Sequence, residues 1–152
     1  MDIKFKKKDK NLLLQDLCSR LLYGVRCSFG VDDAIYEITG INPSSCGASE
    51  IQATHIKSGI NGDFTISSCK PYLFPLSSMT EEQKIECFKG TDIELDEYGE
   101  IWSRFPISDN DIPLTNIHNW LKVINWCYKN HFDVNGLIPL GLAKDATGLN
   151  IY

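Results

Sequence analysis

The order in which two hydrophobic periods occur along the chain restricts its fold more than any other feature. Apolar residues recur at helical spacing around residues 11–23, 80–89 and 115–130, and they alternate with polar residues in the stretches between. The resulting order of a helix, four strands, a helix, two strands and a long helix is typical of α+β proteins. We therefore predict an α+β fold in which antiparallel β-hairpins form a small curved sheet or partial barrel. An N-terminal helix and a long C-terminal helix are expected to pack against it.

The apolar positions of the helices predict which faces are buried. In the first helix they are Leu14, Leu17, Cys18 and Leu21, and Gly24 follows as a left-handed residue that ends it. Thr80 and Gln83 form a capping-box pattern that opens the short second helix. The widest apolar stripe belongs to the helix at 115–130, in which we expect Trp120 and Leu121 to lie in the core.

Three hairpins are expected from the alternating stretches. The first joins residues 25–29 to 34–38, and the second joins 51–56 to 64–68. The pair Asn61-Gly62 suits a type I′ turn, so we place the second turn there. The third hairpin joins 92–96 to 100–105, with Gly99 in the left-handed conformation. Residues 70–76 contain two prolines and are expected to form an extended connection across the surface.

Length and charge limit the domain organisation and the partners. A chain of 152 residues lies within the range of about 100–200 residues that is usual for one domain. We assign residues 11–152 to a single domain and residues 1–10 to a basic, flexible head. Five Lys and two Asp give this head a charge of +3, so a net charge of −5 leaves −8 for the rest. The acidic body disfavours broad contact with nucleic acid, whereas the head leaves such contact open.

The start of the chain does not continue as a secretion signal. Its lysines precede Leu12, Leu13 and Leu14, but Gln15 and Asp16 interrupt the apolar run before it reaches the roughly 7–15 residues of a signal peptide. Nor does any stretch of the sequence approach the ~18 apolar residues that a membrane span requires. We therefore expect a cytoplasmic protein that does not associate with membranes.

The six cysteines are expected to be free thiols that hold no metal. They are spread along the chain without a C-x-x-C pair, and an exporting segment is not predicted. Cys18, Cys27, Cys87 and Cys127 lie among apolar residues, where a reduced cysteine packs as a small hydrophobe. A zinc site requires four ligands. Cys127 and His131 supply two, and the loosely spaced Cys46, His55 and Cys69 supply three.

Catalytic patterns are missing from the sequence. It contains no phosphate-binding glycine loop, no G-x-S-x-G elbow and no deaminase motif, so we assign no catalytic residue and expect no cofactor. The acidic run at 92–96 lacks the glycine and glutamate of a calcium loop. Cys46 lies in a loop rich in Ser and Gly, with His55 nearby in sequence. This pair leaves open a cysteine-dependent hydrolase or transferase.

Aromatic residues beside basic ones provide a candidate binding patch. Lys70 and Tyr72 lie in the extended connection, and Trp102 and Arg104 share one face of the third hairpin. If Ile101 and Phe105 pack inward, Trp102 and Arg104 point outward. Aromatic and Arg side chains are the usual anchors of binding surfaces, so we take Lys70, Tyr72, Trp102 and Arg104 as binding residues. The alternative is that these aromatic residues are part of the core.

Three long strings carry a resemblance that runs over nearly the whole chain. They are LLLQDLCSRLLYGV at 12–25, KPYLFPLSSMTEE at 70–82 and HFDVNGLIP at 131–139. In this order they resemble small uncharacterised proteins encoded by phages and prophages of gut Bacteroidales. Leu22 departs from the pattern, in which Pro precedes Tyr-Gly-Val. The resemblance implies a small accessory protein in the cytoplasm of a bacterial host, and it assigns no activity and no functional residues.

Together these observations favour a non-enzymatic binding protein of a phage or mobile element. Its partner would be a host or phage macromolecule or a nucleotide signal, and interference with a host defence system is one form of this hypothesis. A nucleic-acid-binding accessory protein that uses the Lys-rich head and the aromatic hairpins is one alternative, and the Cys46 enzyme is another. Association of the chain with a second copy of itself is left open.

Overall fold

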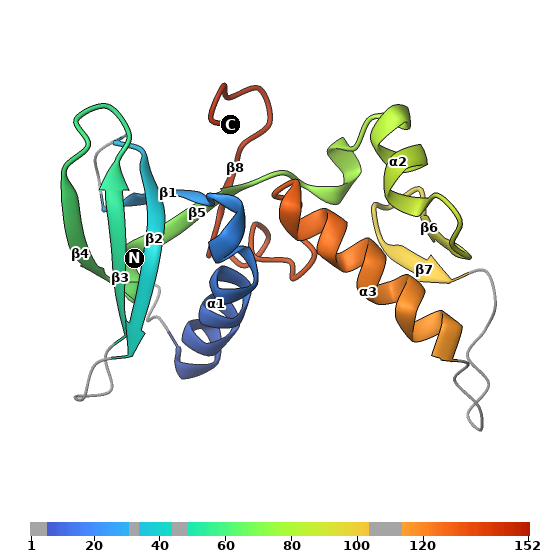
Figure 1. Ribbon diagram of the computed structural model, residues 1–152, viewed down its shortest axis with the longest axis horizontal. Helices are drawn as coiled ribbons and strands as arrows, with labels where there is room; N and C mark the ends of the chain where they lie inside the picture. Colours follow the sequence, from blue (N-terminus) through green and yellow to red (C-terminus); the bar gives the residue numbers. More distant parts are fainter. Residues whose placement is uncertain (1–5, 31–33, 44–48, 104–113) are drawn as a thin grey trace.

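A six-stranded sheet forms one half of the molecule (Figure 1). The computed structural model describes residues 6–30, 34–43, 49–103 and 114–152. The strands are β1 (Arg26–Phe29), β2 (Tyr36–Pro43), β3 (Ser49–His55), β4 (Asn61–Thr65), β5 (Cys69–Leu73) and β8 (Lys144–Asp145), in the spatial order β4-β3-β2-β1-β5-β8. All neighbours are antiparallel except β5 and β8, which are parallel. The helix α1 (Lys7–Arg20) packs on this sheet and continues as a short 3-10 turn, Leu21–Tyr23.

The other half contains α2 (Glu81–Phe88), the two-stranded sheet of β6 (Ile93–Leu95) and β7 (Ile101–Ser103), and the long helix α3 (Leu114–Lys129). Figure 1 shows these elements together on the right, away from the six-stranded sheet. The segment from β5 to α2, which includes the 3-10 turn Leu76–Ser78, and the segment after α3 run between the halves. The fold is therefore α+β with open antiparallel sheets, as predicted.

The hairpins nevertheless do not build one sheet. The third hairpin stays separate, and α3 packs on it and on α2 rather than on the six-stranded sheet. The reason lies in the hydrophobic clusters. Leu13 and Leu17 of α1 join the buried face of the large sheet, whereas Val123 and Cys127 of α3 join Met79, Cys87, Ile93 and Phe132. The helix α1 thus covers the apolar face of the large sheet, and α3 covers the apolar side of α2 and the small hairpin, so two main cores form.

The local signals that rest on capping and glycine are confirmed. Gly24 ends the first helical segment with φ of 66°, and Gly99 turns the third hairpin with φ of 80°. The hydroxyl of Thr80 accepts a hydrogen bond from the Gln83 amide (3.2 Å), and the Gln83 side chain accepts one from the Thr80 amide (2.9 Å). These signals depend on residues within one turn of each other, so tertiary packing did not override them.

The turn of the second hairpin was predicted at the wrong place. Asn61 and Gly62 lie inside β4, opposite Thr54 and Ala53 of β3. The chain reverses over residues 56–59 instead, where Gly59 has φ of 69° and its amide donates to the His55 carbonyl (2.8 Å). This register places Phe64 opposite Ile51, so that the aromatic ring stacks on Phe29 with 3.9 Å between ring centroids. Packing of the aromatic residue decided the register.

Residues 70–76 were wrongly expected to cross the surface. Most of the segment belongs to β5, which pairs with β1 on one side and with the short β8 on the other. Pro71, Tyr72 and Leu73 are buried and only Lys70 is exposed. The proline is accommodated because β8 pairs with β5 only at Tyr72 and Leu73, one residue beyond Pro71.

The first helix begins earlier than predicted and buries a different face. It starts at Lys7, so the last four residues of the proposed flexible head are helical, and the Lys6 amide donates to the Asp9 carboxylate (3.2 Å). The buried positions are Leu13, Asp16, Leu17 and Arg20, while Cys18 is exposed. No helix within the described ranges is long and apolar enough to cross a membrane.

Leu121 was also expected in the core, but it is 56% exposed, whereas Leu17 is fully buried. We expect Leu17→Ala to lower the free energy of unfolding by about 2–5 kcal/mol, because it removes buried methyl groups and leaves a cavity. The change Leu121→Ala should cost less than about 1 kcal/mol. Urea unfolding followed by circular dichroism measures both, and similar losses at the two positions would contradict this assignment of the core.

Candidate functional site

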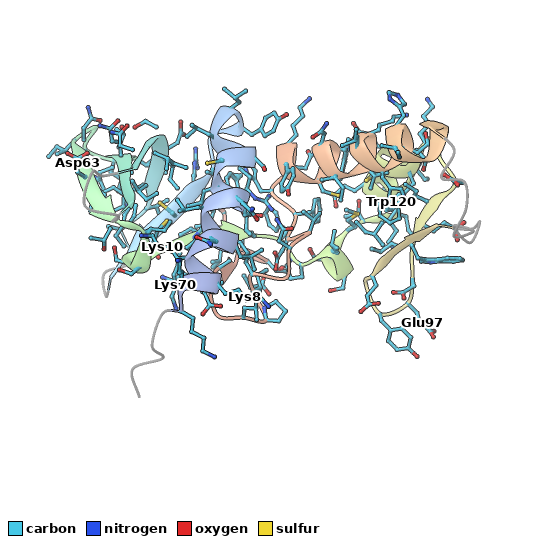
Figure 2. All side chains as sticks on the ribbon, turned by 90° about the horizontal axis from the view of Figure 1, so that it is seen from below. Lys8, Lys10, Asp63, Lys70, Glu97 and Trp120 are labelled. Atoms are coloured by element: carbon cyan, nitrogen blue, oxygen red, sulfur yellow. The ribbon has the colours of Figure 1, made fainter. Side chains whose placement is uncertain are left out.

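The residues predicted to form a binding patch do not come together in the structure. Tyr72 is only 5% exposed and packs with Ala146 and Ile151, and Lys144 lies over its ring at 5.4 Å from the centroid. Lys70 is exposed on β5 and lies near Lys8 and Lys10 of α1 (Figure 2). Trp102 belongs to β7 in the opposite half. Arg104 lies outside the described residues.

Part of the reasoning about the third hairpin holds. Ile101 is half-buried and packs on the second core, and Trp102, on the other face of β7, is 43% exposed. Trp102 therefore points outward, as predicted, without Tyr72 or Lys70 beside it. The patch fails as a unit because β5 became an interior strand of the large sheet.

The two halves of the molecule are joined through a buried ion pair. Asp16 and Arg20, one helical turn apart on α1, are both fully buried. Arg20 donates to the two carboxylate oxygens of Asp16 from Nε (2.7 Å) and Nη2 (2.9 Å). A two-pronged contact of this kind holds both side chains in one orientation. Charges removed from water need such compensation, because their desolvation is costly.

This ion pair binds the chain segment that follows α3. Nη2 of Arg20 also donates to the Phe132 carbonyl (2.7 Å), and its guanidinium carbon lies 4.8 Å from the centre of the Tyr128 ring. The side-chain amide of Asn135 donates to the Asp16 carboxylate (2.9 Å) and to the Tyr128 hydroxyl (3.1 Å). The first helix thus holds the end of α3 and the following loop in a fixed position.

A pair of backbone hydrogen bonds, the Phe74 bridge, completes the contact between the two halves, which we call the junction. The Phe74 amide donates to the His131 carbonyl (2.9 Å), and the Asp133 amide donates to the Phe74 carbonyl (2.9 Å). Residues on either side of this bridge line two different concave surfaces. We name the larger one the junction groove and the smaller one the tail cavity.

The junction groove has a volume of about 610 Å³, which is within the usual range of ligand sites. It is lined by Pro75, Leu76, Ser77, Tyr98, Gly99, Glu100, Ile101, Trp120, Ile124, Asp133, Val134, Gly136, Ile138 and Pro139. Figure 2 shows Trp120 below α3, on the side of the β6–β7 hairpin. A Cβ atom at Gly99 would lie 3.1 Å from that of Ser77, so this glycine lets the hairpin approach the connecting segment.

The groove is apolar at its centre and acidic at its rim. Among the residues that the structure describes, its lining contains Glu100 and Asp133 but no Lys or Arg. Asp133 is buried and accepts hydrogen bonds from the Leu137 and Ile138 amides (both 2.8 Å), so it shapes the loop. The hairpin turn adds the exposed Glu97 and Glu100, with Tyr98 80% exposed between them. Such a surface suits an apolar partner that carries positive charge.

The C-terminal residues close the other side of the junction. The Tyr152 hydroxyl donates to the Tyr72 carbonyl (2.7 Å) and accepts from the Arg26 amide (3.1 Å). Its ring stacks on His131 with 3.8 Å between centroids. Burial, helped by the charges of Arg20 and Arg26, lowers the pKa of His131 to about 4. His131 is therefore neutral at physiological pH.

The described cysteines do not resemble catalytic groups. Cys27, Cys69, Cys87 and Cys127 are buried free thiols, and Cys18 is exposed. Burial raises the pKa of Cys27, and the contact with Cys87 (3.9 Å between sulfurs) followed by burial raises the pKa of Cys127. Thiols with raised pKa values are poor nucleophiles at neutral pH. Cys46 lies outside the described residues.

His55 and the potential metal ligands show no catalytic or metal-binding arrangement. Nδ1 of His55 lies 2.7 Å from the Ser58 hydroxyl and accepts the Ser58 amide (3.1 Å), which fixes the β3–β4 turn. Within residues 6–30, 34–43, 49–103 and 114–152, no three His, Cys, Asp or Glu side chains are grouped to hold a metal ion.

Sequence reasoning missed the residues that build the junction. Asp16 and Arg20 were treated as polar interruptions of an apolar run. Their spacing of four residues, with the acid first, is a recognised pairing signal on a helix. Together with Leu13 and Leu17 they occupy one helical face. That combination could have indicated a buried pair, although the groove itself depends on elements that are distant in sequence.

Comparison of the chain with protein-family models, with curated proteins and with solved structures finds no match. The functional argument therefore depends on the geometry of the junction.

The buried ion pair yields a stability prediction. Arg20→Met should lower the free energy of unfolding by about 3–5 kcal/mol, because it leaves the Asp16 charge buried without its cation. The double change Asp16→Leu with Arg20→Met should recover much of this loss. The exposed pair of Lys84 and Glu81 (2.7 Å) is the control, and Lys84→Met should cost below about 1 kcal/mol. Equal losses for Arg20→Met and Lys84→Met in urea unfolding would refute the role of the pair.

His131 yields a pH prediction. Its pKa is about 4 in the folded chain and 6.5 when unperturbed, so between these values only the unfolded state takes up the proton. Stability should therefore fall as the pH drops from about 6.5 to 4, by up to about 3 kcal/mol from this residue. His131→Asn removes the titration and suits the left-handed backbone at this position (φ 62°). An unchanged dependence of stability on pH in this variant would contradict the assignment.

Proposed function

We propose that this chain is a non-enzymatic binding protein of a phage or other mobile element, and that its junction groove holds a basic, apolar segment of a partner protein. The observation that carries this proposal is the combination of apolar walls with an acidic rim, where the described lining residues include no Lys or Arg. A partner segment with Arg or Lys beside Leu or Phe would bury its apolar side chains and place its charges against Glu97 and Glu100.

The aromatic residues of the groove support the same function. Tyr98 is exposed at the rim, and Trp120 is half-buried in the wall. Aromatic side chains are the commonest anchors at protein interfaces, because they bury a large area with few rotatable bonds. The prolines at 75 and 139 add rigid apolar surface on the opposite side. A wall of this kind accepts an extended or helical segment without large rearrangement.

The biological setting follows from the resemblance to phage and prophage proteins. We propose that the protein acts in the cytoplasm of a bacterial host and binds a host or phage protein. Interference with a defence system is one such role, because it requires only that a partner be occupied. No catalytic residue and no cofactor are needed for this activity.

A nucleic-acid-binding role is the second candidate, supported by a specific observation. Lys6, Lys7 and Lys8 are exposed at the start of α1, and Figure 2 shows Lys70 near this end of the helix. Binding through these lysines would weaken steeply as salt is raised. The cysteine-dependent enzyme centred on Cys46 has no support among the described residues and remains a lesser proposal.

The groove is tested with fluorescent peptides in which Arg or Lys alternates with Leu or Phe. Matched peptides with Glu in place of the basic residues are the controls for charge. We expect the basic peptides to bind and the acidic ones to fail, as measured by fluorescence anisotropy. Tyr98→Ala and Glu100→Gln should each weaken binding about fivefold or more, the usual cost of removing an interface anchor.

Trp102→Ala is the matched variant, because Trp102 is an exposed aromatic residue of the same hairpin that does not line the groove. It should leave peptide affinity unchanged. Weaker binding in Trp102→Ala together with normal binding in Tyr98→Ala would move the site to the outer face of β7. The groove would be refuted if the basic peptides do not bind at all. It would also be refuted if substitution of the lysines at the start of α1 abolishes peptide binding while Tyr98→Ala and Glu100→Gln leave it unchanged.

A further inference from the structure

The tail cavity is a second concave surface, on the other side of the Phe74 bridge. It has a volume of about 400 Å³ and lies between the start of α2, the end of α3 and the C-terminal residues. Its polar lining includes Lys129, His131, Ser78, Thr80 and Thr147. The groove proposed for the partner protein shares none of these residues.

The charge of the tail cavity is opposite to that of the groove. Its described lining contains Lys129 and no Asp or Glu. Lys129 forms no ion pair within the described part of the chain. Two acids adjoin the lining residue Thr80: Glu81 pairs with Lys84 (2.7 Å), and Glu82 is hydrogen-bonded to the Thr80 side chain, which helps to lower its pKa. Arg20 and Arg26 help to lower the pKa of His131, but neither lines the cavity, and Asp16 balances the charge of Arg20.

Unpartnered nitrogen atoms gather behind the wall of the cavity. Nδ1 of His131, Nη1 of Arg20 and Nε of Arg26 are buried and have no hydrogen-bond partner among the described residues. His131 itself is 8% exposed, lines the cavity and has a left-handed backbone with φ of 62°. The left-handed backbone ends α3, as the bonds from the His131 and Phe132 amides to the Tyr128 and Cys127 carbonyls show. Buried polar atoms are rarely left without partners, so the unpartnered nitrogen of His131, the one of the three residues that lines the cavity, points to a ligand at this position.

Aromatic rings form the rest of the cavity. Phe74, Phe132 and Tyr152 line it, and the stacked rings of Tyr152 and His131 extend this surface. The Phe74 ring lies 5.9 Å from that of Phe132 and 6.0 Å from that of Tyr152. Planar ligands bind well to such surfaces through ring stacking.

We propose that the tail cavity binds a small anion that carries a planar ring, of the size and chemistry of a nucleoside monophosphate. The ring packs against Phe74 and Tyr152, and the anionic group meets Lys129 and the Thr147 hydroxyl. Lysine binds phosphate as a compact positive charge, and hydroxyl groups complete its hydrogen bonds. This site is independent of the junction groove.

The test is titration calorimetry of the full chain with the four common nucleoside 5′-monophosphates. Adenosine supplies a ring without the charge, and inorganic phosphate supplies the charge without a ring. We expect at least one monophosphate to bind, and each fragment to bind about tenfold or more weakly. Lys129→Gln should weaken the monophosphate about tenfold, as expected for a hydrogen bond between charged groups. The matched variant Lys57→Gln, at an exposed lysine of the β3–β4 turn, should not change the affinity.

Several results would overturn the proposal. One is that none of the four monophosphates binds at millimolar concentration. Another is that Lys129→Gln binds the monophosphate as tightly as the unchanged protein does. A third is that inorganic phosphate binds as tightly as the monophosphate. Tyr98→Ala separates this site from the groove, because it should weaken peptide binding without affecting the monophosphate. Amide chemical shifts should change at Thr147 and His131 on addition of ligand, and changes confined to the Lys-rich start of α1 would contradict the site.

Discussion

The buried ion pair of Asp16 and Arg20 is the interaction on which the rest of the structure depends. The two hydrophobic cores belong to different sets of elements, and apolar packing alone would leave their relative position loosely determined. The ion pair connects them, because Arg20 donates to the Phe132 carbonyl while Asp16 accepts from Asn135. Buried charges tolerate little displacement, because each lost hydrogen bond would leave part of their desolvation cost uncompensated. Polar contacts therefore set the angle between the halves.

The concave surfaces are consequences of this junction. The loop after α3 is held by Arg20 on one side and by the Phe74 bridge on the other, so it cannot collapse into the space between the halves. The groove remains on the side of the acidic hairpin, and the tail cavity remains on the side of Lys129 and Tyr152. The described linings of the two surfaces differ in charge. The partner protein and the small anion that we propose would therefore lie on opposite sides of the bridge.

The candidate site could be predicted from sequence only in part. The outward position of Trp102 and the left-handed Gly99 follow from alternation and turn chemistry, which are local. The grouping of Trp102 with Tyr72 could not follow, because it required knowing that β5 lies inside the sheet between β1 and β8. Two prolines argued for an exposed segment, yet Pro71 fits where the pairing with β8 has not begun. The groove is formed by residues of four separate segments, and no local pattern indicates their convergence.

The sequence by itself determined the types of most elements, the capping box of the second helix, the glycine turns at 24 and 99, and the α+β class. These features depend on interactions within a few residues, whose energies are present before the chain folds. Tertiary structure decided the register of the second hairpin, the buried face of α1 and the separation of α3 from the large sheet. In each case the choice was made by contacts distant in sequence: Phe64 on Phe29, Arg20 on Phe132, and Val123 and Cys127 on the core around Ile93. Burial of these groups contributes more free energy than the local preferences that it overrides.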